Sequence, residues 1–273
     1  MHGGDLGRKV LLDRQIKFID NIMIKPDSPA LNYGCGLFET VLFDKGSIFF
    51  LKDHLKRLKN SCAELKLPVP ESEWALEESI ADLISQNGLT DKTARIKIMF
   101  APLFEKTVWN MLVSAAEYNR DISPVRGSIS QSIRDSAFYK HKTLSYMQNY
   151  LSIAGRNDEE ILFANFQNNI IEGSRSNILC VKDNALYYCD QAENYLYGIM
   201  QKHIIADHKK LGFNNCETVK VGFSKEFLED CTGAIMVNSL VIARDYSSLS
   251  LEKKEIKFIP SDTGERIRNF YLK

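Results

Sequence analysis

The sequence lacks a net charge: lysine plus arginine and aspartate plus glutamate number 35 each among its 273 residues. A neutral chain has no overall field to attract nucleic acid or an anionic membrane, so any charged ligand must be held by local groups. Basic stripes with interleaved aromatic residues, which accompany nucleic-acid binding, are also missing. We therefore expect a small-molecule ligand, and neither a nucleic-acid nor a membrane partner.

The six cysteines form no CxxC pair and no cysteine–histidine cluster with the spacing of metal ligands. We therefore expect no bound metal and a reducing compartment. No window approaches the roughly 20 apolar residues that a membrane helix needs. The first ten residues, MHGGDLGRKV, lack the apolar run of a signal peptide. Together these absences predict a cytoplasmic protein.

Regular βαβ units with a glycine-rich first turn are absent, so the pattern does not predict a doubly wound nucleotide fold. What the chain does have is a hydrophobic content of 44%, enough for the core of one large domain or two smaller ones. The polar segment 117–123, followed by Pro124, is the best linker candidate. It predicts an N-terminal α/β domain, residues 1–120, and a C-terminal domain, residues 121–273.

Periodicity organises the predicted N-terminal domain. Residues 37–51 predict a β-hairpin that turns at residues 44–46, and Asp53 then caps a helix. A second helix is predicted over residues 71–87, with Gly88 ending it. The apolar faces of the two helices are formed by Leu55, Leu58, Cys62 and Leu65, and by Leu76, Ile80, Leu83 and Ile84. Further apolar segments are a strand at 94–100 and a stretch at 109–115.

Short strands and helices alternate irregularly in the predicted C-terminal domain, which indicates an α+β arrangement. Strands are expected at 160–166, 176–182, 185–189 and 233–243. Helices are expected near 143–155, 199–211 and 224–230, with Gly212 closing the second and Ser224 capping the third.

Three residues could take part in chemistry, although each has an ordinary explanation when it is taken alone. Lys142 lies in YKHKTLSYMQN between a predicted strand and a helix, where a lysine is usually a solvated charge. Glu172 lies in IIEGSRSNILC, where a carboxylate before glycine and serine is usually a turn or capping residue. Arg57 would ordinarily lie on the exposed face of its helix. No reaction follows from any one of them.

Four separated places in the chain carry distinctive segments. They are YGCGLFET (33–40) with DHLKRL (53–58), KTLSYMQNYL (142–151), EGSRSNI (172–178), and LYGIMQ (196–201) with IMVNSL (235–240). In this order they resemble the class-IV aminotransferase family, also called pyridoxal-phosphate (PLP) fold type IV. The family's motifs are YGDGxFET followed by HxxRL, then KTLNYLxNVL, then EGSxSN, and finally GI(T/M)R followed by TNSL or CNAL. Four matches in register form a strong signal.

The resemblance implies an α+β fold of two domains, the C-terminal one a larger irregular or pseudo-barrel domain, with PLP as cofactor. It implies that Lys142 is catalytic and carries PLP as a Schiff base, because this chemistry needs an amine that can also move protons. It assigns Glu172 to the pyridine nitrogen, whose protonated form a carboxylate stabilises, and Tyr146 to the phenolate oxygen. The groups assigned to the phosphate are Arg57, the N–H groups of Ile199 and Met200, and Asn238 with Ser239.

Departures from the motifs bear on the substrate. Aspartate, asparagine and arginine of the motifs are replaced by Cys35, Ser145 and Gln201. The Arg-Gly pair that ends the family's RIRLTVTRG strand is Pro102-Leu103 here. In several relatives that arginine helps to grip substrate carboxylates. A replacement charge would have to come from Lys97, Lys106 or Arg175. Phe38 and Thr40 lie where relatives line the substrate pocket.

Two activities compete within this resemblance. One is lyase chemistry, as in 4-amino-4-deoxychorismate lyase, which releases pyruvate and leaves 4-aminobenzoate for folate synthesis. The other is amino-group transfer, as in branched-chain and D-amino-acid aminotransferases. Met200 in GIM, the Asn-Ser-Leu after Val237 and the segment 190–192 (DQA) favour the lyase, whereas Glu39 and Tyr146 are shared with aminotransferases.

A third hypothesis is a non-catalytic relative that keeps the fold as a binding protein. It is disfavoured because Lys142 and Glu172 are both present, and a protein freed from PLP chemistry would not need the pair. Relatives are homodimers, so the resemblance also implies a homodimer.

Overall fold

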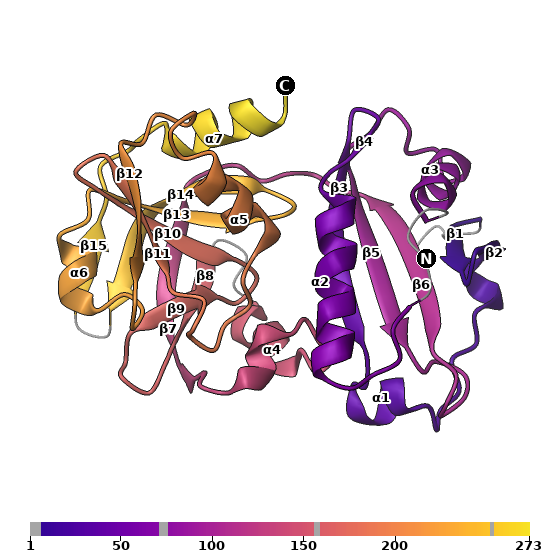
Figure 1. Ribbon diagram of the computed structural model, residues 1–273. Coiled ribbons are helices and arrows are strands. Elements are labelled where there is room, and N and C mark those ends of the chain that lie inside the picture. Colours follow the sequence, from indigo (N-terminus) through magenta and orange to yellow (C-terminus); the bar gives the residue numbers. More distant parts are fainter. Residues whose placement is uncertain (1–6, 71–75, 156–158, 252–253) are drawn as a thin grey trace. The chain divides into compact units, whose positions relative to one another are not determined.

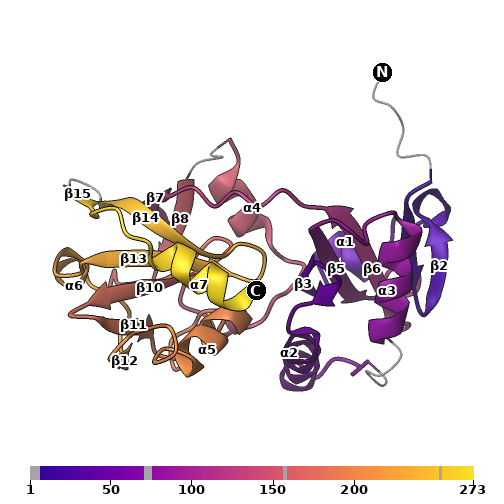
Figure 2. The same cartoon turned by 90° about the horizontal axis from the view of Figure 1, so that it is seen from above.

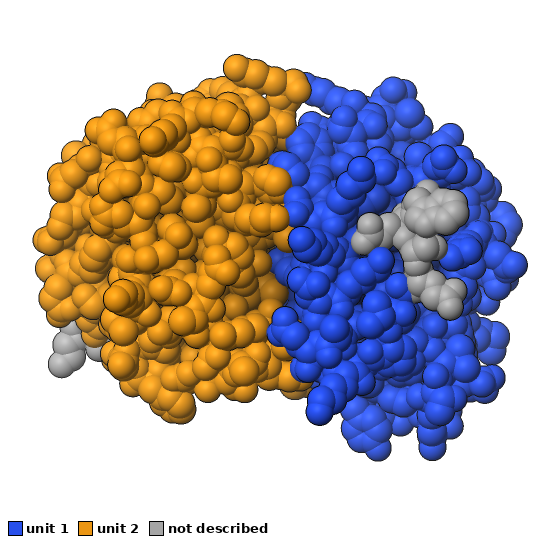
Figure 3. Space-filling view, in the orientation of Figure 1, with its two compact units in different colours: residues 1–119, 142–146 blue, residues 120–141, 147–273 orange. Residues whose placement is uncertain are grey.

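The computed structural model describes residues 7–70, 76–155, 159–251 and 254–273 (Figure 1). The chain forms two compact units, drawn in two colours in Figure 3. Unit 1 comprises residues 1–119 and 142–146, and unit 2 comprises residues 120–141 and 147–273. The segment that holds Lys142 therefore belongs to unit 1, although it follows residue 120, where the sequence predicts a domain boundary.

The described part of unit 1 contains a six-stranded antiparallel sheet with the order β2-β1-β6-β5-β3-β4. Its strands are β1 (Lys9–Leu12), β2 (Gln15–Phe18), β3 (Leu37–Asp44), β4 (Ser47–Ile48), β5 (Ala94–Ala101) and β6 (Asn110–Glu117). The predicted hairpin is confirmed by β3 and β4. Its turn residues, Lys45 and Gly46, have φ angles of 49° and 81°, as a two-residue turn between twisted strands requires.

The helices of unit 1 are α1 (Pro29–Tyr33), α2 (Leu51–Glu64) and α3 (Leu76–Gln86), with a 3₁₀ turn at Ile19–Asn21. Figure 2 shows α2 and α3 along one face of the sheet, where their apolar residues pack on β3, β5 and β6. Gly88, with a φ of 64°, follows α3 as predicted. The predicted start of this helix, residues 71–75, lies outside the described residues.

The predicted capping role of Asp53 is wrong. α2 begins at Leu51, and its N-cap is Phe50, which has a φ of 53° and no capping side chain. Asp53 lies in the first turn of the helix instead, where its negative charge interacts favourably with the positive end of the helix dipole. The chain enters α2 directly from the β-hairpin, and this tertiary path places the helix start three residues earlier than the capping pattern predicts.

The described part of unit 2 is built around a nine-stranded mixed sheet with the order β12-β11-β10-β13-β14-β7-β8-β9, and β15 pairs with β14. Its strands are β7 (Val125–Ile133), β8 (Glu159–Ala164), β9 (Ile170–Gly173), β10 (Asn177–Lys182), β11 (Ala185–Cys189), β12 (Asn215–Val219), β13 (Gly233–Asn238), β14 (Ile242–Leu251) and β15 (Lys254–Lys257). The pairs β11–β12, β7–β14 and β7–β8 are parallel. The predicted α+β class is thereby confirmed.

One predicted strand, 233–243, proves to be two. Oδ1 of Asn238 accepts hydrogen bonds from the N–H groups of Leu240 and Val241, both at 2.9 Å. These bonds reverse the chain, so β13 ends at Asn238 and β14 returns antiparallel to it. A side chain that bonds to the backbone two and three residues ahead is a turn signal, and it outweighs the apolar run.

The helices of unit 2 are α4 (Met147–Ile153), α5 (Ile199–Ala206), α6 (Lys225–Glu229) and α7 (Thr263–Tyr271), with a 3₁₀ turn at Ala137–Lys140. Ser224 caps α6 as predicted, because its Oγ accepts from the N–H of Phe227 at 3.2 Å. The predicted helix over 143–155 starts later than expected, since the residues after Lys142 are extended. Among the helices of the described segments, none has the length and apolar character that crossing a membrane requires.

Candidate active site

Lys142 is held by an extended segment that adds to the start of β3. The N–H of Phe38 donates to the carbonyl of Lys142, and the N–H of Leu144 donates to the carbonyl of Gly36, both at 2.9 Å. Gly36 has a φ of 145°, and a Cβ on it would lie 2.6 Å from the Cβ of Ala101. Only glycine permits this approach, so the second glycine of YGCG lets the lysine segment pair with β3.

Two aromatic rings flank the amine of Lys142. Its Nζ lies 4.4 Å from the ring centroid of Phe38 and 5.0 Å from that of Tyr146. The two rings meet edge to face, with centroids 5.2 Å apart. A half-buried amine confined between aromatic rings has few accessible rotamers, which suits a group that must act at one place.

The substrate residues predicted on the sheet of unit 1 lie on one face. In the antiparallel register Thr40 is opposite Lys97 and Phe38 is opposite Met99, so Phe38, Thr40 and Lys97 project to the same side. The Nζ of Lys97 lies 5.0 Å from the Phe38 ring centroid. Burial, with a smaller contribution from Arg95, lowers the pKa of Lys97. Lys97 therefore shares the Phe38 ring with Lys142, whereas Lys106 is exposed in the loop after β5.

Glu39 projects to the opposite face, toward α2, and anchors a buried charged cluster. Nε and Nη2 of Arg57 donate to its two carboxylate oxygens at 2.8 and 2.6 Å, and Nδ1 of His54 lies 2.7 Å from Oε2. Burial raises the pKa of Glu39, but the Arg57 guanidinium and the His54 bond outweigh it and bring that pKa to about 2. Burial lowers the pKa of His54. Glu39 is thus an anion that orients Arg57.

Glu172, in unit 2, is a buried carboxylate at the end of β9. Its Oε1 accepts from Nη1 of Arg134 at 2.5 Å, and its Oε2 accepts from the N–H of Leu196 at 3.2 Å. Nη2 of Arg134 donates to Oδ1 of Asn149, and its guanidinium lies 3.7 Å from the ring centroid of Phe163. Both charges are therefore paired and hydrogen-bonded, as burial demands.

The sequence-based interpretation missed Arg134, because it lies outside the four matching segments. The interpretation also missed the way in which Glu39 and His54 orient Arg57. Their signal was available, since both residues lie within the first matching pair of motifs.

The N-terminus of α5 has no side-chain cap. Its N-cap, Gly198, supplies no side-chain hydrogen bond, so the N–H groups of the first turn, at Ile199 and Met200, have no partner within the helix. A Cβ on residue 198 would lie 2.0 Å from Oδ1 of Asn177, which explains the glycine. Asn177 in turn donates to the carbonyl of Leu196 at 2.8 Å and holds the approach to the helix.

Two other predicted residues are engaged elsewhere in unit 2. The Asn238 side chain holds the β13–β14 turn, in which Ser239 is half-buried, and donates to the carbonyl of Arg175 at 3.2 Å. Nε of Arg175 donates to Glu160 at 2.9 Å. Arg175 therefore forms an ion pair with Glu160. Among the cations predicted to bind substrate, Lys97 is the one that lies at the same aromatic ring as Lys142.

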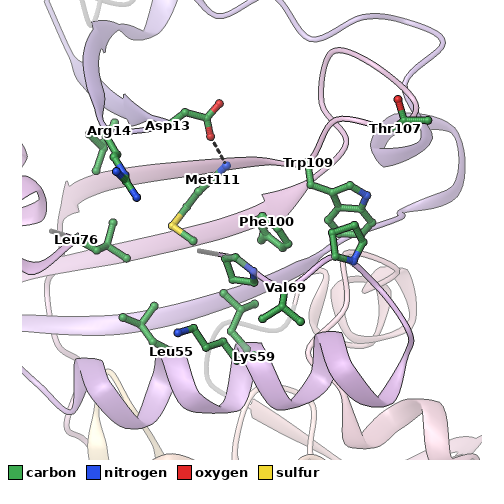
Figure 4. Close-up of a pocket in the computed structure, with 14 residues that line it drawn as sticks. Asp13, Arg14, Leu55, Lys59, Val69, Leu76, Phe100, Thr107, Trp109 and Met111 are labelled. Carbon is green, nitrogen blue, oxygen red and sulfur yellow. Dashed lines mark hydrogen bonds between the residues drawn. The ribbon is translucent and has the colours of Figure 1, made fainter. Parts of the chain in front are cut away.

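A cavity of about 390 Å³ in unit 1 contains none of the predicted site residues. Its walls include Leu55 and Lys59 of α2, Phe100 of β5, Met111 of β6, and Trp109, which precedes β6. The N–H of Met111 donates to Asp13 at 2.8 Å (Figure 4). Phe100 is opposite Leu37 in the register, so this cavity lies on the α2 side of the sheet. Lys97 and Phe38 project to the other side. Within the described ranges, no group of three or more histidine, cysteine or acidic residues is arranged to hold a metal.

These features match known proteins. Residues 36–248 match the family described as amino-transferase class IV, and the chain belongs to that family. It is 25% identical over 258 residues to a probable branched-chain-amino-acid aminotransferase of Rickettsia felis, covering 89% of this chain and 87% of the relative. It is 24% identical over 280 residues to the aminodeoxychorismate lyase of Bacillus subtilis, covering 89% and 93%.

Solved structures show the same fold. A branched-chain aminotransferase from Thermoproteus uzoniensis, described with norvaline, superposes with a TM-score of 0.84 at 20% identity, over 96% of this chain and 93% of that chain. The PLP-bound form of a hypothetical aminotransferase from Mycobacterium tuberculosis gives 0.80 at 19% identity, over 95% and 97%. The predicted fold type IV is confirmed.

Proposed function

We propose that this chain is a PLP-dependent enzyme in which Lys142 carries the cofactor and moves the reacting proton. PLP is the cofactor that membership of the class IV family indicates, and one matched structure is described as PLP-bound. The residues of this chain fit it. They include an amine, a buried carboxylate and a helix N-terminus whose first-turn N–H groups have no side-chain cap.

When bound, PLP supplies an electrophilic carbon and a ring that withdraws electrons from the substrate. Glu172 would face its ring nitrogen as an anion, and Arg134 would keep that anion in place. Arg57, the N–H groups of Ile199 and Met200, and Asn238 with Ser239 would hold the phosphate. Asn238 would contact the phosphate through its backbone, because its side chain is hydrogen-bonded within the β13–β14 turn. Tyr146 would donate to the phenolate oxygen.

We favour the release of pyruvate from 4-amino-4-deoxychorismate, which leaves 4-aminobenzoate. The observation that carries this choice is the pair of lysines on the Phe38 ring, because this substrate bears carboxylates as well as an amine. Lys97 would hold a carboxylate in place of the family's missing arginine. The Lys142 amine would remove the proton from the ring carbon that bears nitrogen and return a proton to the departing three-carbon unit. The GIM and NSL motifs and the Bacillus subtilis relative agree with this choice.

The second candidate is amino-group transfer, which the Rickettsia relative favours. A product assay separates the two activities. A lyase releases pyruvate from aminodeoxychorismate without any 2-oxo acid, whereas a transaminase needs both an amino donor and an acceptor. Purified protein with aminodeoxychorismate alone, and separately with an amino-acid panel plus 2-oxoglutarate, is to be analysed by mass spectrometry. Transfer products without pyruvate release would overturn the lyase proposal, and the absence of both products would revive the non-catalytic hypothesis.

We also propose a homodimer. α4 exposes three apolar side chains at helical spacing, namely Met147 at 72%, Tyr150 at 69% and Leu151 at 61%. A stripe of this kind on a short helix is typical of an interaction surface. Light scattering on the wild type and on Met147→Glu/Leu151→Glu tests the assignment. A monomeric wild type, or a double variant that dimerises as well as the wild type, contradicts it.

A further inference from the structure

We propose that Glu160 is a positioning residue whose buried carboxylate gathers the turn at residues 174–176 and thereby fixes the carboxylate of Glu172. The proposal rests on the proposed function, because it assigns Glu160 a role through Glu172. Nothing in the four matching motifs points to Glu160, which lies on β8 between the second and the third of them. Its side chain is fully buried, and acidic side chains are almost never fully buried unless they are paired.

Three consecutive residues donate to the Glu160 carboxylate. Oε1 accepts from the Oγ of Ser174 at 3.3 Å, from the N–H of Arg175 at 2.9 Å and from the Oγ of Ser176 at 2.7 Å. Oε2 accepts from Nε of Arg175 at 2.9 Å. The carboxylate thus accepts the hydrogen bonds of donors that point into the turn and that water would otherwise have to satisfy. These bonds are charge-assisted, so they hold the turn strongly.

The turn packs tightly against this carboxylate. The N–H of Gly173 donates to the carbonyl of Ser176 at 2.8 Å, and the N–H of Ser174 donates to the carbonyl of Ile161 at 2.7 Å. A Cβ on Gly173 would lie 2.3 Å from Oγ of Ser176 and 2.4 Å from Oε1 of Glu160. The glycine and the serines of EGSRS are therefore explained by Glu160 as much as by any ligand.

Two paths lead from this turn to Glu172. The first is covalent, since Glu172 immediately precedes Gly173 and is paired with Phe163 on the same strand as Glu160. The second runs through hydrogen bonds. The carbonyl of Ser174 accepts from Nδ2 of Asn149, Oδ1 of Asn149 accepts from Arg134, and Arg134 donates to Oε1 of Glu172. A turn that loosens would move both the backbone of Glu172 and the arginine that orients its carboxylate.

The adjacent residue is a matched control. Glu159 is half-buried, and its carboxylate lies 3.9 Å from Nη2 of Arg126, which is 57% exposed. An exposed pair at that distance adds little to stability. Glu159→Ala removes a similar charge from the same strand and keeps the Glu160 carboxylate and all of its donor residues.

A double-mutant cycle tests the proposal. Glu160→Ala is made in the wild type and in Glu172→Gln, and single-turnover rates, PLP dissociation constants and the pH titration of cofactor absorbance are measured. We expect Glu160→Ala to lower the wild-type rate about 100-fold, as misplacement by 1 Å can, and to shift the absorbance titration. In Glu172→Gln it should cause no further loss of rate. Glu159→Ala should match the wild type in both backgrounds.

Glu160→Gln should remain within a few-fold of the wild type. Its amide oxygen can still accept from the N–H of Arg175, and the half-exposed Arg175 side chain can turn away from the amide nitrogen. If Glu160→Ala does not fold, Glu160→Asp enters the same cycle, because it keeps the charge but cannot reach all four donors.

Equal fractional losses of rate in the wild type and in the Glu172→Gln background would show that Glu160 acts on the fold alone and would overturn the proposal, as would no loss at all. A normal rate in Glu172→Gln by itself would refute the proposed role of Glu172, and the inference would fall with it. The two failures are therefore distinguishable in one set of proteins.

Discussion

Nη1 of Arg134 lies 2.5 Å from Oε1 of Glu172, and both side chains are buried. Removing one member of such a pair leaves the other charge uncompensated. We therefore expect Arg134→Met to lower the free energy of unfolding by about 3–5 kcal/mol, measured by urea titration of the apoprotein. Arg126→Met, in an exposed pair, should cost about 0–1 kcal/mol. Equal effects of the two variants would contradict the assignment of Arg134–Glu172 as a buried pair.

Borohydride reduction should fix a pyridoxyl group on Lys142. The amine lies between Phe38 and Tyr146 in the segment that matches the family's lysine motif. Peptide mapping by mass spectrometry locates the label, and Lys142→Ala should lose it together with the visible absorbance. Lys140→Ala, two residues away and half-buried, is the control and should be labelled normally. A label on a different lysine would refute the central role of Lys142.

Arg57→Ala should weaken PLP binding by roughly 10- to 150-fold, the value of a charge-assisted contact. The structure adds a second effect, because Arg57 donates two hydrogen bonds to the buried Glu39. We therefore also expect a lower free energy of unfolding in the apoprotein. Arg57→Ala/Glu39→Gln should recover part of that stability without recovering PLP affinity. An unchanged PLP dissociation constant in Arg57→Ala would show that this arginine serves Glu39 only.

Stability should fall as the pH falls below about 6.5. Burial lowers the pKa of His54, so the unfolded chain takes up its proton first. Glu39 has a pKa of about 2 in the folded state against an ordinary 4.5, so at lower pH the unfolded chain also protonates this carboxylate first. In both cases the unfolded state binds more protons, which favours unfolding on acidification. The stability from Glu39 is fully present above pH 4.5, is lost toward pH 2, and is of the order of 3 kcal/mol at most, since one pKa unit is about 1.4 kcal/mol.

Urea titrations from pH 7 to pH 3 check this dependence. Glu39→Gln should be less stable than the wild type at pH 7 and should show a shallower fall below pH 4.5. Identical slopes in the two proteins would exclude Glu39 as the titrating group.

Lys97→Met should raise KM for a carboxylate substrate roughly 10-fold or more, by removing a charge-assisted contact. The effect on kcat should be smaller, because Lys142 and not Lys97 is assigned to proton transfer. Lys97→Arg should recover most of the affinity. Lys106→Met, in the exposed loop, provides the matched control and should leave KM unchanged. A loss confined to kcat would place Lys97 in the chemical step instead.

The local features of this protein could be predicted from the sequence because they depend on neighbouring residues. The β3–β4 hairpin follows from a turn that Gly46 allows, and the buried faces of α2 and α3 follow from apolar residues at helical spacing. The matching motifs likewise single out Lys142 and Glu172 as candidates, since each stands inside a distinctive segment.

Tertiary structure decided what depends on residues far apart in the chain. The segment after Lys142 is extended because it bonds to Phe38 and Gly36, more than 100 positions away, and the competing helix starts only at Met147. Arg134 could not be assigned to Glu172, 38 positions later, because the residues next to Arg134 in the sequence do not indicate which carboxylate it pairs with. Sequence by itself determined the family and the local elements, and it supplied the proposal that Lys142 is the reacting lysine. Only the fold decided which buried charges are paired, because the cost of burying a charge is met by whichever donors the completed packing brings to it.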